Sequence, residues 1–225
     1  MFYWLMKHWV IGPLLTTVFR PWIKGLENVP QTGPVIIVCN HRSFVDSVFL
    51  PLMVDRQMAF LAKSDYFTGT GFKGWIVRFF MTSAGQLPID RSGGKASEAS
   101  LNAGLAILAE GKVLAIYPEG TRSPDGRMYR GRTGVARMIL EARVPVIPAA
   151  VIDTEKVMPL GSNVPRVHPV GIVIGEALDF TRFKGMEGDR FVLRSITDEI
   201  VYEMNKLSQQ EYVDVYASTI RATMA

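Results

Sequence analysis

A histidine and an aspartate stand close together in the sequence, in a pattern that could support base catalysis. His41 and Asp46 are separated by four residues and follow an apolar run that ends at Cys39. A carboxylate that accepts a hydrogen bond from one imidazole nitrogen fixes the tautomer and leaves the other nitrogen as a general base. The sequence contains no G-x-S-x-G nucleophile elbow, and Cys39 lies within the apolar run. A pair of this kind without a protein nucleophile suits direct attack by a substrate hydroxyl on an activated acyl group.

The spacing of His41 and Asp46 restricts how the two side chains can meet. Five positions in a regular helix correspond to a rotation of about 140°, which would place them on different faces. We therefore expect His41 in a turn and Asp46 in the first turn of the following helix, with Ser43 as the N-cap residue. An acid three residues after an N-cap also occupies the position of a capping-box acid. On spacing alone, Asp46 could simply cap its helix while His41 serves as a loop residue.

Two further polar clusters also follow predicted strands directly. Asp90 and Arg91 follow a strand predicted at residues 84–89, and residues 118–123 (PEGTRS) follow a strand predicted at residues 113–117. In an open parallel sheet the carboxyl ends of the strands share one edge, and ligands bind in the crevice there. The three clusters are therefore expected to converge on one site.

The PEGTRS cluster has the composition of a phosphate-binding turn. Gly120 would let the backbone approach a ligand closely, and Thr121 and Arg122 suit phosphate oxygens. Arg91 could add a second phosphate contact. The alternative is an ordinary turn with a Glu119–Arg122 pair, because the Ser-Pro-Asp-Gly residues that end the cluster are typical of turns. Three further candidate contacts for substrate or donor are Asn40, Ser43 and Lys63.

Short apolar runs alternate with helical patterns along most of the chain. Strands are expected at residues 35–39, 58–62, 84–89, 113–117, 144–152 and 170–174. Helices are expected at residues 43–54, 71–81, 95–110, 133–142 and 191–207, and Gly111 is expected to end the third of them. This alternation predicts an α/β fold with a largely parallel central sheet flanked by helices.

The composition of the chain limits its class and its partners. With 225 residues, of which 48% are hydrophobic, most of the chain fits one α/β domain, placed here at residues 25–225. A single cysteine excludes an intrachain disulfide, and only three histidines accompany it, so no metal site is expected. The net charge of +4 arises from scattered basic residues. A mildly basic surface that meets anionic lipid or phosphorylated substrates is therefore expected, and nucleic acid is not.

Residues 1–24 differ in composition from the rest of the chain. They are rich in aromatic residues, and a Lys-His pair and a Gly-Pro pair interrupt the apolar stretch. A transmembrane helix needs about 20 clean apolar residues, so this segment is too short and too broken to be one. We expect a monotopic helix in the membrane interface, with Trp4, Trp9 and Trp22 at headgroup level. The alternative is a helix that packs onto the core.

Taken together, these clusters resemble the lysophosphatidic acid acyltransferase family, also described as the PlsC-type glycerolipid acyltransferases. The resemblance covers roughly residues 20–178. It rests on an H-x4-D motif at His41 and Asp46, a block at residues 85–91, a PEGTRS block at residues 117–123 and an apolar block at residues 144–148. One departure is Tyr117, where the family commonly has Phe.

The resemblance implies transfer of a fatty acyl group from acyl-CoA or acyl-carrier protein to the free hydroxyl of lysophosphatidic acid, giving phosphatidic acid. It implies that His41 is the general base and that Asp46 orients it. The implied contacts of the glycerol phosphate are Arg91, Glu119, Gly120, Thr121 and Arg122. No metal or cofactor is implied, and the expected location is the cytoplasmic face of the cell membrane, with monotopic attachment. Other acceptors (glycerol 3-phosphate, another lysophospholipid or a glycolipid) and an inactive lipid-binding protein remain as alternatives.

Overall fold

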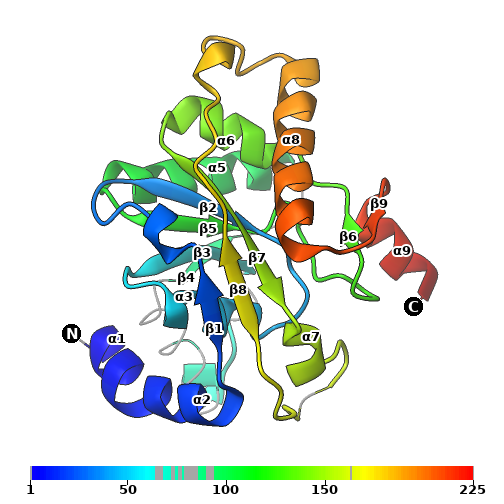
Figure 1. Cartoon of the computed structure of the whole chain (residues 1–225). Coiled ribbons are helices and arrows are strands. Elements are labelled where there is room, and N and C mark those ends of the chain that lie inside the picture. The colour runs from blue at the N-terminus through cyan, green and yellow to red at the C-terminus, as the bar shows by residue number, and fades with distance from the viewer. Residues whose placement is uncertain are drawn as a thin grey trace.

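A seven-stranded sheet forms the middle of the molecule, and helices cover both of its faces (Figure 1). The computed structural model describes residues 2–63, 68–71, 74, 75, 78, 86–89, 94–162 and 164–224. The strand order across the sheet is β1-β8-β7-β2-β5-β3-β4. These strands are Trp22–Lys24 (β1), Val35–Cys39 (β2), Met58–Lys63 (β3), Gln86–Ile89 (β4), Val113–Ile116 (β5), Val146–Ile152 (β7) and Gly171–Ile174 (β8).

Five adjacent strands, from β4 to β7, run parallel to one another. β8 is antiparallel to β7, and β1 pairs with β8 in parallel at the edge of the sheet. The predicted α/β fold with a largely parallel sheet is confirmed, and every predicted strand has its counterpart. β1 was not predicted, because three residues after an aromatic segment show no clear alternation.

The central strand β2 shows why the sheet has two cores. Its five residues are apolar, four of them are β-branched, and all five are buried. Val35, Ile37 and Cys39 pack into the core on one face, whereas Ile36 and Val38 pack into the core on the other. A parallel strand buried on both faces needs helices on both sides, which is the arrangement observed.

Helices α2 (Ile11–Phe19) and α3 (Asp46–Met53) cover one face of the sheet. The other face is covered by α5 (Gly94–Ala109), α6 (Gly134–Ala142) and α8 (Arg190–Ser208), close to their predicted positions. Gly111 follows the end of α5 with φ of 73°, a left-handed conformation that favours glycine. A short helix, α7 (Thr154–Val157), follows β7. The helix predicted at residues 71–81 falls largely outside the described residues.

The N-terminal segment consists of α1 (Phe2–Leu5), a π-helical turn (Met6–Val10) and α2. Its inner side packs on the core through Leu15 and Phe19, and Lys7 donates hydrogen bonds to the carbonyls of Pro51 and Val54 at the end of α3. Its outer side exposes Trp4, Leu5, Trp9, Val10 and Leu14. None of the helices built from described residues is long and apolar enough to cross a membrane.

The chain after α8 forms a strap, defined here as residues 209–224. Within this strap, β9 (Tyr212–Val213) pairs in parallel with β6 (Met128–Tyr129), and α9 (Ala217–Met224) follows. Figure 1 shows β6, β9 and α9 together at one side of the molecule, away from α1 and α2. The strap was not predicted, since two-residue strands carry no period that a sequence can reveal.

Candidate active site

The ends of β2 and β5 lie side by side because the two strands are parallel neighbours. Residues 40–41 leave β2 and residues 117–123 leave β5 at the same edge of the sheet. Two of the three predicted clusters are therefore brought together, as expected. The third cluster follows β4 in the same parallel sheet, but Asp90 and Arg91 themselves lie outside the described residues.

His41 and Asp46 form the expected pair at this edge. The Nδ1 atom of His41 lies 2.8 Å from Oδ2 of Asp46. Asp46 is buried, whereas the His41 side chain is 18% exposed. Because Nδ1 is engaged by the carboxylate, Nε2 is the ring nitrogen that can accept a proton from a substrate. His41 precedes α3 and Asp46 is in its first turn, which confirms the predicted arrangement.

The same carboxylate also organises the turn before α3. Oδ2 of Asp46 accepts hydrogen bonds from the backbone amides of Arg42, at 2.7 Å, and Ser43, at 2.8 Å. Oδ1 is buried and has no hydrogen-bond partner among the residues that the structure describes. Asp46 therefore both shapes the turn and orients His41. The helix-capping role and the orienting role, given above as alternatives, belong to the same carboxylate.

The predicted N-cap role of Ser43 is wrong. The N-cap residue of α3 is Val45, and it makes no side-chain cap hydrogen bond. The Ser43 hydroxyl instead donates to the carbonyl of Met158, at 2.7 Å. Asp46 reaches backward to the Ser43 amide, so this helix start has the acid half of a capping box without the serine half.

Tyr117 stacks on one face of the His41 ring. The two rings are stacked with centroids 3.9 Å apart and an interplanar angle of 8°. The Tyr117 hydroxyl lies 3.0 Å from Oγ of Ser47 on α3, and burial raises the pKa of Tyr117 well above its usual value. The phenol therefore stays neutral and restricts rotation of the imidazole. Sequence reasoning assigned Tyr117 no role, although its place directly after β5 is a usable signal.

Glu119 lies beneath the loop and joins it to the histidine turn. Its Oε1 accepts from the His41 amide at 3.1 Å, and its Oε2 accepts from the Tyr129 amide at 3.3 Å. A second connection runs from the Ser123 amide to the His41 carbonyl, at 2.7 Å. Burial, aided by the nearby charge of Asp46, raises the pKa of Glu119 to about 8, although the two amides oppose this shift. Glu119 thus positions the loop, and its predicted contact with substrate stays a prediction.

The loop between these two connections carries Gly120, Thr121 and Arg122. Gly120 has φ of 73°, and a Cβ atom there would lie 3.0 Å from Nε of Arg132, so glycine fits both the backbone and the close approach. Oγ1 of Thr121 accepts a hydrogen bond from Arg221, at 2.6 Å. Within the described part of the chain, no carboxylate lies within ion-pair distance of Arg122. The Glu119–Arg122 pair of the alternative interpretation is therefore not formed.

Asn40 is buried and fastens the end of β2 to β7. Its Nδ2 donates to the carbonyl of Val151 at 3.1 Å, and its Oδ1 accepts from the Val151 amide at 2.7 Å. Nδ2 also donates to Oε1 of Gln210, at 2.6 Å. These bonds make Asn40 a support of the His41 turn. The side chain of Lys63, another predicted contact, lies outside what the structure describes.

Comparisons with known proteins show the family of the chain. A family model described as Acyltransferase matches residues 20–152, which is more than half of the chain. The chain belongs to the acyltransferase family. The resemblance to the lysophosphatidic acid acyltransferases, predicted from the motifs, is thereby confirmed.

Two relatives of this acyltransferase are named 1-acyl-sn-glycerol-3-phosphate acyltransferases. One is a chloroplast protein of Brassica napus, 32% identical over 142 residues, which cover 63% of this chain and 40% of that protein. The other is from Bacillus subtilis, 28% identical over 192 residues, which cover 83% of this chain and 89% of that protein. The chain thus spans less than half of the chloroplast relative.

A solved structure shares the fold of the acyltransferase. It is the 1-acyl-sn-glycerophosphate acyltransferase PlsC of Thermotoga maritima, with a TM-score of 0.62 and 23% sequence identity. The match covers 88% of this chain and 81% of that one. The family model ends at residue 152, so the contacts of Gln210 and Arg221 with the site lie beyond it.

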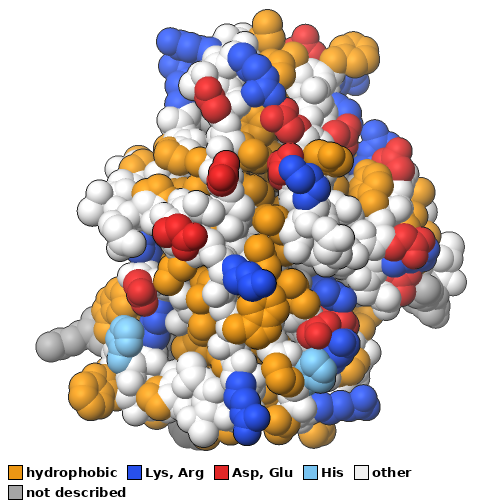
Figure 2. All heavy atoms as spheres, in the orientation of Figure 1, with side chains coloured by type: hydrophobic (Ala, Val, Ile, Leu, Met, Phe, Trp, Pro, Cys, Tyr) orange, Lys and Arg blue, Asp and Glu red, His pale blue; other side chains and the backbone are white. Residues whose placement is uncertain are grey.

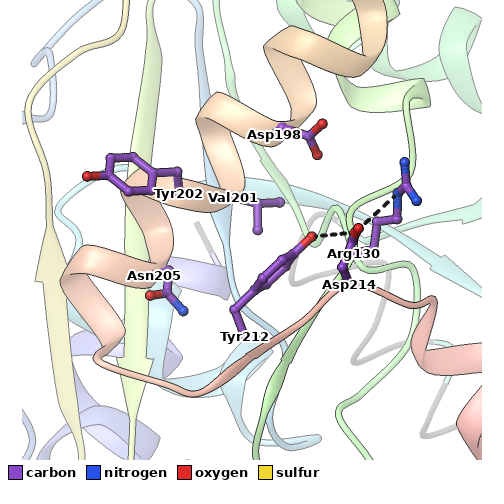
Figure 3. A pocket seen from close by; sticks show the side chains of 7 residues that line it. All are labelled: Arg130, Asp198, Val201, Tyr202, Asn205, Tyr212 and Asp214. Carbon is purple, nitrogen blue, oxygen red and sulfur yellow. Dashed lines mark hydrogen bonds and ion pairs between the residues drawn. The ribbon is translucent and has the colours of Figure 1, made fainter.

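A cavity of about 330 Å³ lies between α8 and the strap (Figure 3). It is lined by Arg130, Asp198, Val201, Tyr202, Asn205, Tyr212 and Asp214. Within this lining, Asp214 contacts both Arg130 and Tyr212. It contains none of the motif residues, so the candidate active site is the edge that carries His41. The described residues contain no group of three or more His, Cys, Asp or Glu that could hold a metal ion.

Proposed function

We propose that this acyltransferase moves a fatty acyl group from an acyl thioester, acyl-CoA or acyl-carrier protein, to the free hydroxyl of lysophosphatidic acid. The product would be phosphatidic acid. The observation that carries the proposal is the His41–Asp46 pair, which leaves Nε2 as a base beside the loop of Gly120, Thr121 and Arg122. The names of the plant and bacterial relatives support this choice of acceptor.

The proposed reaction is a direct transfer without an acyl-enzyme. Nε2 of His41 takes the proton of the acceptor hydroxyl while its oxygen attacks the thioester carbonyl. Asp46 stabilises the imidazolium that forms, as a buried carboxylate does in other histidine-based sites. The tetrahedral intermediate then expels the thiolate, which recovers the proton from His41. Such base assistance is typically worth about 10²- to 10⁴-fold in rate.

Cys39 is the one thiol near the site, and its environment favours this direct route. It is fully buried in β2, and burial raises the pKa of its thiol well above the ordinary value. Nearby Asp46 raises the pKa further. Because the thiolate is the nucleophilic form of cysteine, this side chain is suited to packing and not to acyl transfer.

The acceptor phosphate is proposed to bind at the loop from Gly120 to Arg122. The loop offers a guanidinium without a carboxylate partner among the described residues, a hydroxyl and closely packed backbone. Arg91 is proposed as a further contact from the end of β4. A guanidinium binds phosphate oxygens with two parallel hydrogen bonds, which suits a monoester better than a neutral alcohol.

The N-terminal segment is proposed to attach the protein to the cytoplasmic face of the cell membrane. Lys7, which interrupts the apolar stretch, turns inward to the carbonyls of Pro51 and Val54. The outward side is therefore left to Trp4, Leu5, Trp9, Val10 and Leu14. Figure 2 shows hydrophobic side chains at the lower left of the view, where α1 and α2 lie in Figure 1, with polar and basic side chains between them. An exposed aromatic and aliphatic surface of this kind suits the interface of a bilayer.

The test is release of thiol from labelled acyl-CoA and acyl-carrier protein by the purified protein, with and without lysophosphatidic acid. Release that requires the acceptor, with phosphatidic acid identified by mass spectrometry, is the expected result. Release without the acceptor would indicate a hydrolase, and no release with either donor would indicate a lipid-binding protein. A parallel panel of glycerol 3-phosphate, other lysophospholipids and a glycolipid identifies any different acceptor.

A further inference from the structure

The C-terminal strap is held firmly along the segment that follows the PEGTRS loop. The Met128 amide donates to the carbonyl of Glu211 at 2.9 Å, and the Arg130 amide donates to the carbonyl of Val215 at 3.0 Å. Arg130 also lies 3.6 Å from the carboxylate of Asp214, as Figure 3 shows beside the cavity. These bonds fix the course of the strap over β6.

Each end of the strap contacts one of the two motifs that form the site. Near its start, Oε1 of Gln210 accepts from Asn40, and Nε2 of Gln210 donates to the carbonyl of Gly126 at 2.5 Å. In α9, Nη1 of Arg221 donates to Oγ1 of Thr121, at 2.6 Å. The strap therefore contacts both the turn before α3 and the loop after β5. Both segments are distant from the strap in the sequence.

Within the described part of the chain, the contact with Thr121 uses only a small part of the hydrogen-bonding capacity of Arg221. A guanidinium has five N–H donors, and one of them serves Thr121. Within the described residues, Arg221 and the neighbouring Arg122 and Arg132 have no carboxylate within ion-pair distance. Glu119 beneath the loop is neutral below about pH 8, because burial raises its pKa to that value. Positive charge is thus present at this loop, and the described residues place no carboxylate within ion-pair distance of it.

The direction of the hydrogen bond between Arg221 and Thr121 matters for a ligand. The Thr121 oxygen acts as the acceptor, so its own O–H is free to donate elsewhere. The remaining guanidinium N–H groups and this hydroxyl can then donate together to the oxygens of one anion. A phosphate monoester has the charge and the number of acceptors to satisfy them.

We propose that Arg221 is a further acceptor-binding residue, which binds the acceptor phosphate together with Thr121. Gln210 is a positioning residue that holds the strap against Asn40 and so keeps Arg221 at the loop. This inference rests on the proposed function for the nature of the acceptor. It adds to the site a segment that lies outside the region matched by the family model.

Arg221→Gln is the variant that separates binding from loop support. Glutamine keeps a hydrogen-bond donor on a polar side chain but carries no charge. With lysophosphatidic acid, we expect the KM of the acceptor to rise about 10- to 100-fold, the range for loss of a hydrogen bond between charged groups. The KM of the donor and the kcat should change less than about twofold. Arg221→Lys, which keeps the charge, should recover part of the loss.

Arg190→Gln is the matched control. Arg190 is an exposed arginine at the first residue of α8, whereas the strap follows the last residue of that helix. It should leave every constant unchanged. The same variants are compared with monoacylglycerol, which has the hydroxyl and the acyl chain of the acceptor but no phosphate. An equal loss with both acceptors would show that Arg221 only supports the loop and would overturn the proposal. An unchanged KM in Arg221→Gln would also overturn it.

Binding measured without turnover keeps this test independent of the proposed reaction. Calorimetric titration with a short-chain lysophosphatidic acid should show 10- to 100-fold weaker binding by Arg221→Gln than by the unaltered protein. If the unaltered protein binds this lipid but releases no thiol, the proposed function fails while the role of Arg221 is still decided. Absence of binding by the unaltered protein would overturn both. Equal melting temperatures of the variants verify that each is folded.

Discussion

The carboxyl edge of the sheet and the N-terminal segment depart from the usual distribution of residues in opposite ways. At the sheet edge, polar side chains such as Asn40, Asp46 and Glu119 are almost fully buried. In the N-terminal segment, large apolar side chains are exposed, and Trp9 reaches 79%. Buried polar groups and exposed apolar patches are the informative exceptions in a folded protein, because both lower stability unless something compensates them.

The two regions are compensated in different ways. At the edge, the buried acids find most of their hydrogen-bond partners within the protein: Oδ2 of Asp46 meets a ring nitrogen and two amides, and Glu119 meets two amides. The exposed aromatic side chains of the N-terminal segment are not covered by other described residues. The buried charge of Lys7 is satisfied by the carbonyls of Pro51 and Val54 at the end of α3. The edge is therefore stabilised largely by contacts within the protein, whereas the exposed apolar side chains of the N-terminal segment are the surface for which we propose attachment to a bilayer.

The largest effect is expected at the edge, from removal of the base. His41→Ala should lower acyl transfer about 10²- to 10⁴-fold, because proton removal from the acceptor hydroxyl then lacks a catalyst. Steady-state thiol release measures this loss, and the melting temperature should show that the protein is still folded. His168→Ala, at a histidine outside the site, is the control and should retain full activity. Near-normal turnover by His41→Ala would contradict the mechanism.

A second effect should appear in the dependence of stability on pH. The pKa of Glu119 is about 8 in the folded protein and about 4.5 in an unfolded chain. Between these values the folded state holds a proton that the unfolded state has lost. Rising pH therefore lowers the free energy of unfolding, by about 1.4 kcal/mol for each pH unit. Above about pH 8 this contribution levels off.

Glu119→Gln should remove that slope, since its amide resembles the neutral acid at every pH. Urea unfolding at pH 5, 6, 7 and 8 measures the difference between the two proteins. As the pH rises, the free energy of unfolding of the variant should increasingly exceed that of the unaltered protein. Glu27→Gln, at an exposed glutamate, should leave the slope unchanged. A parallel pH dependence of the unaltered protein and Glu119→Gln would show that Glu119 is ionised in the fold.

The fold was predictable where the signal is local. Four β-branched residues in β2 predict a buried strand, and Gly111 marks the end of α5. The pairing of His41 with Asp46 was also predictable, since the two residues are only five positions apart at the start of one helix. The role of Ser43 was mispredicted because the acceptor of its hydroxyl, the Met158 carbonyl, lies 115 residues away in the sequence.

The parts of the site that were missed depend on long-range contacts. Gln210 lies 170 residues from Asn40, and Arg221 lies 100 residues from Thr121. Neither belongs to a motif, and the two-residue strand β9 that brings them to the site has no recognisable period. A single sequence contains no record of such pairings, so only the folded chain reveals them.

A smaller effect is expected in the N-terminal segment. Trp9→Ser should weaken binding to vesicles of phosphatidylglycerol and phosphatidylcholine about tenfold, because one large aromatic side chain no longer leaves water. Sedimentation of the protein with vesicles measures this. Phe191→Ser is the control: Phe191 is 88% exposed at the start of α8, which lies at the opposite end of the molecule from α1 and α2 in Figure 1. Equal losses in both variants would indicate nonspecific adhesion and remove the contrast between the two regions.

The smallest effect should come from the hydroxyl of Tyr117 at the edge. Tyr117→Phe keeps the ring stacked on His41 and loses the hydrogen bond to Ser47, so stability should fall by about 1 kcal/mol while activity stays within about threefold. Ser47→Ala removes the same bond from the other side and should match it in urea unfolding. Tyr117→Leu removes the stacked ring and should lower activity more than either. If Tyr117→Phe is as inactive as Tyr117→Leu, the hydroxyl orients the base and the stacked ring does not.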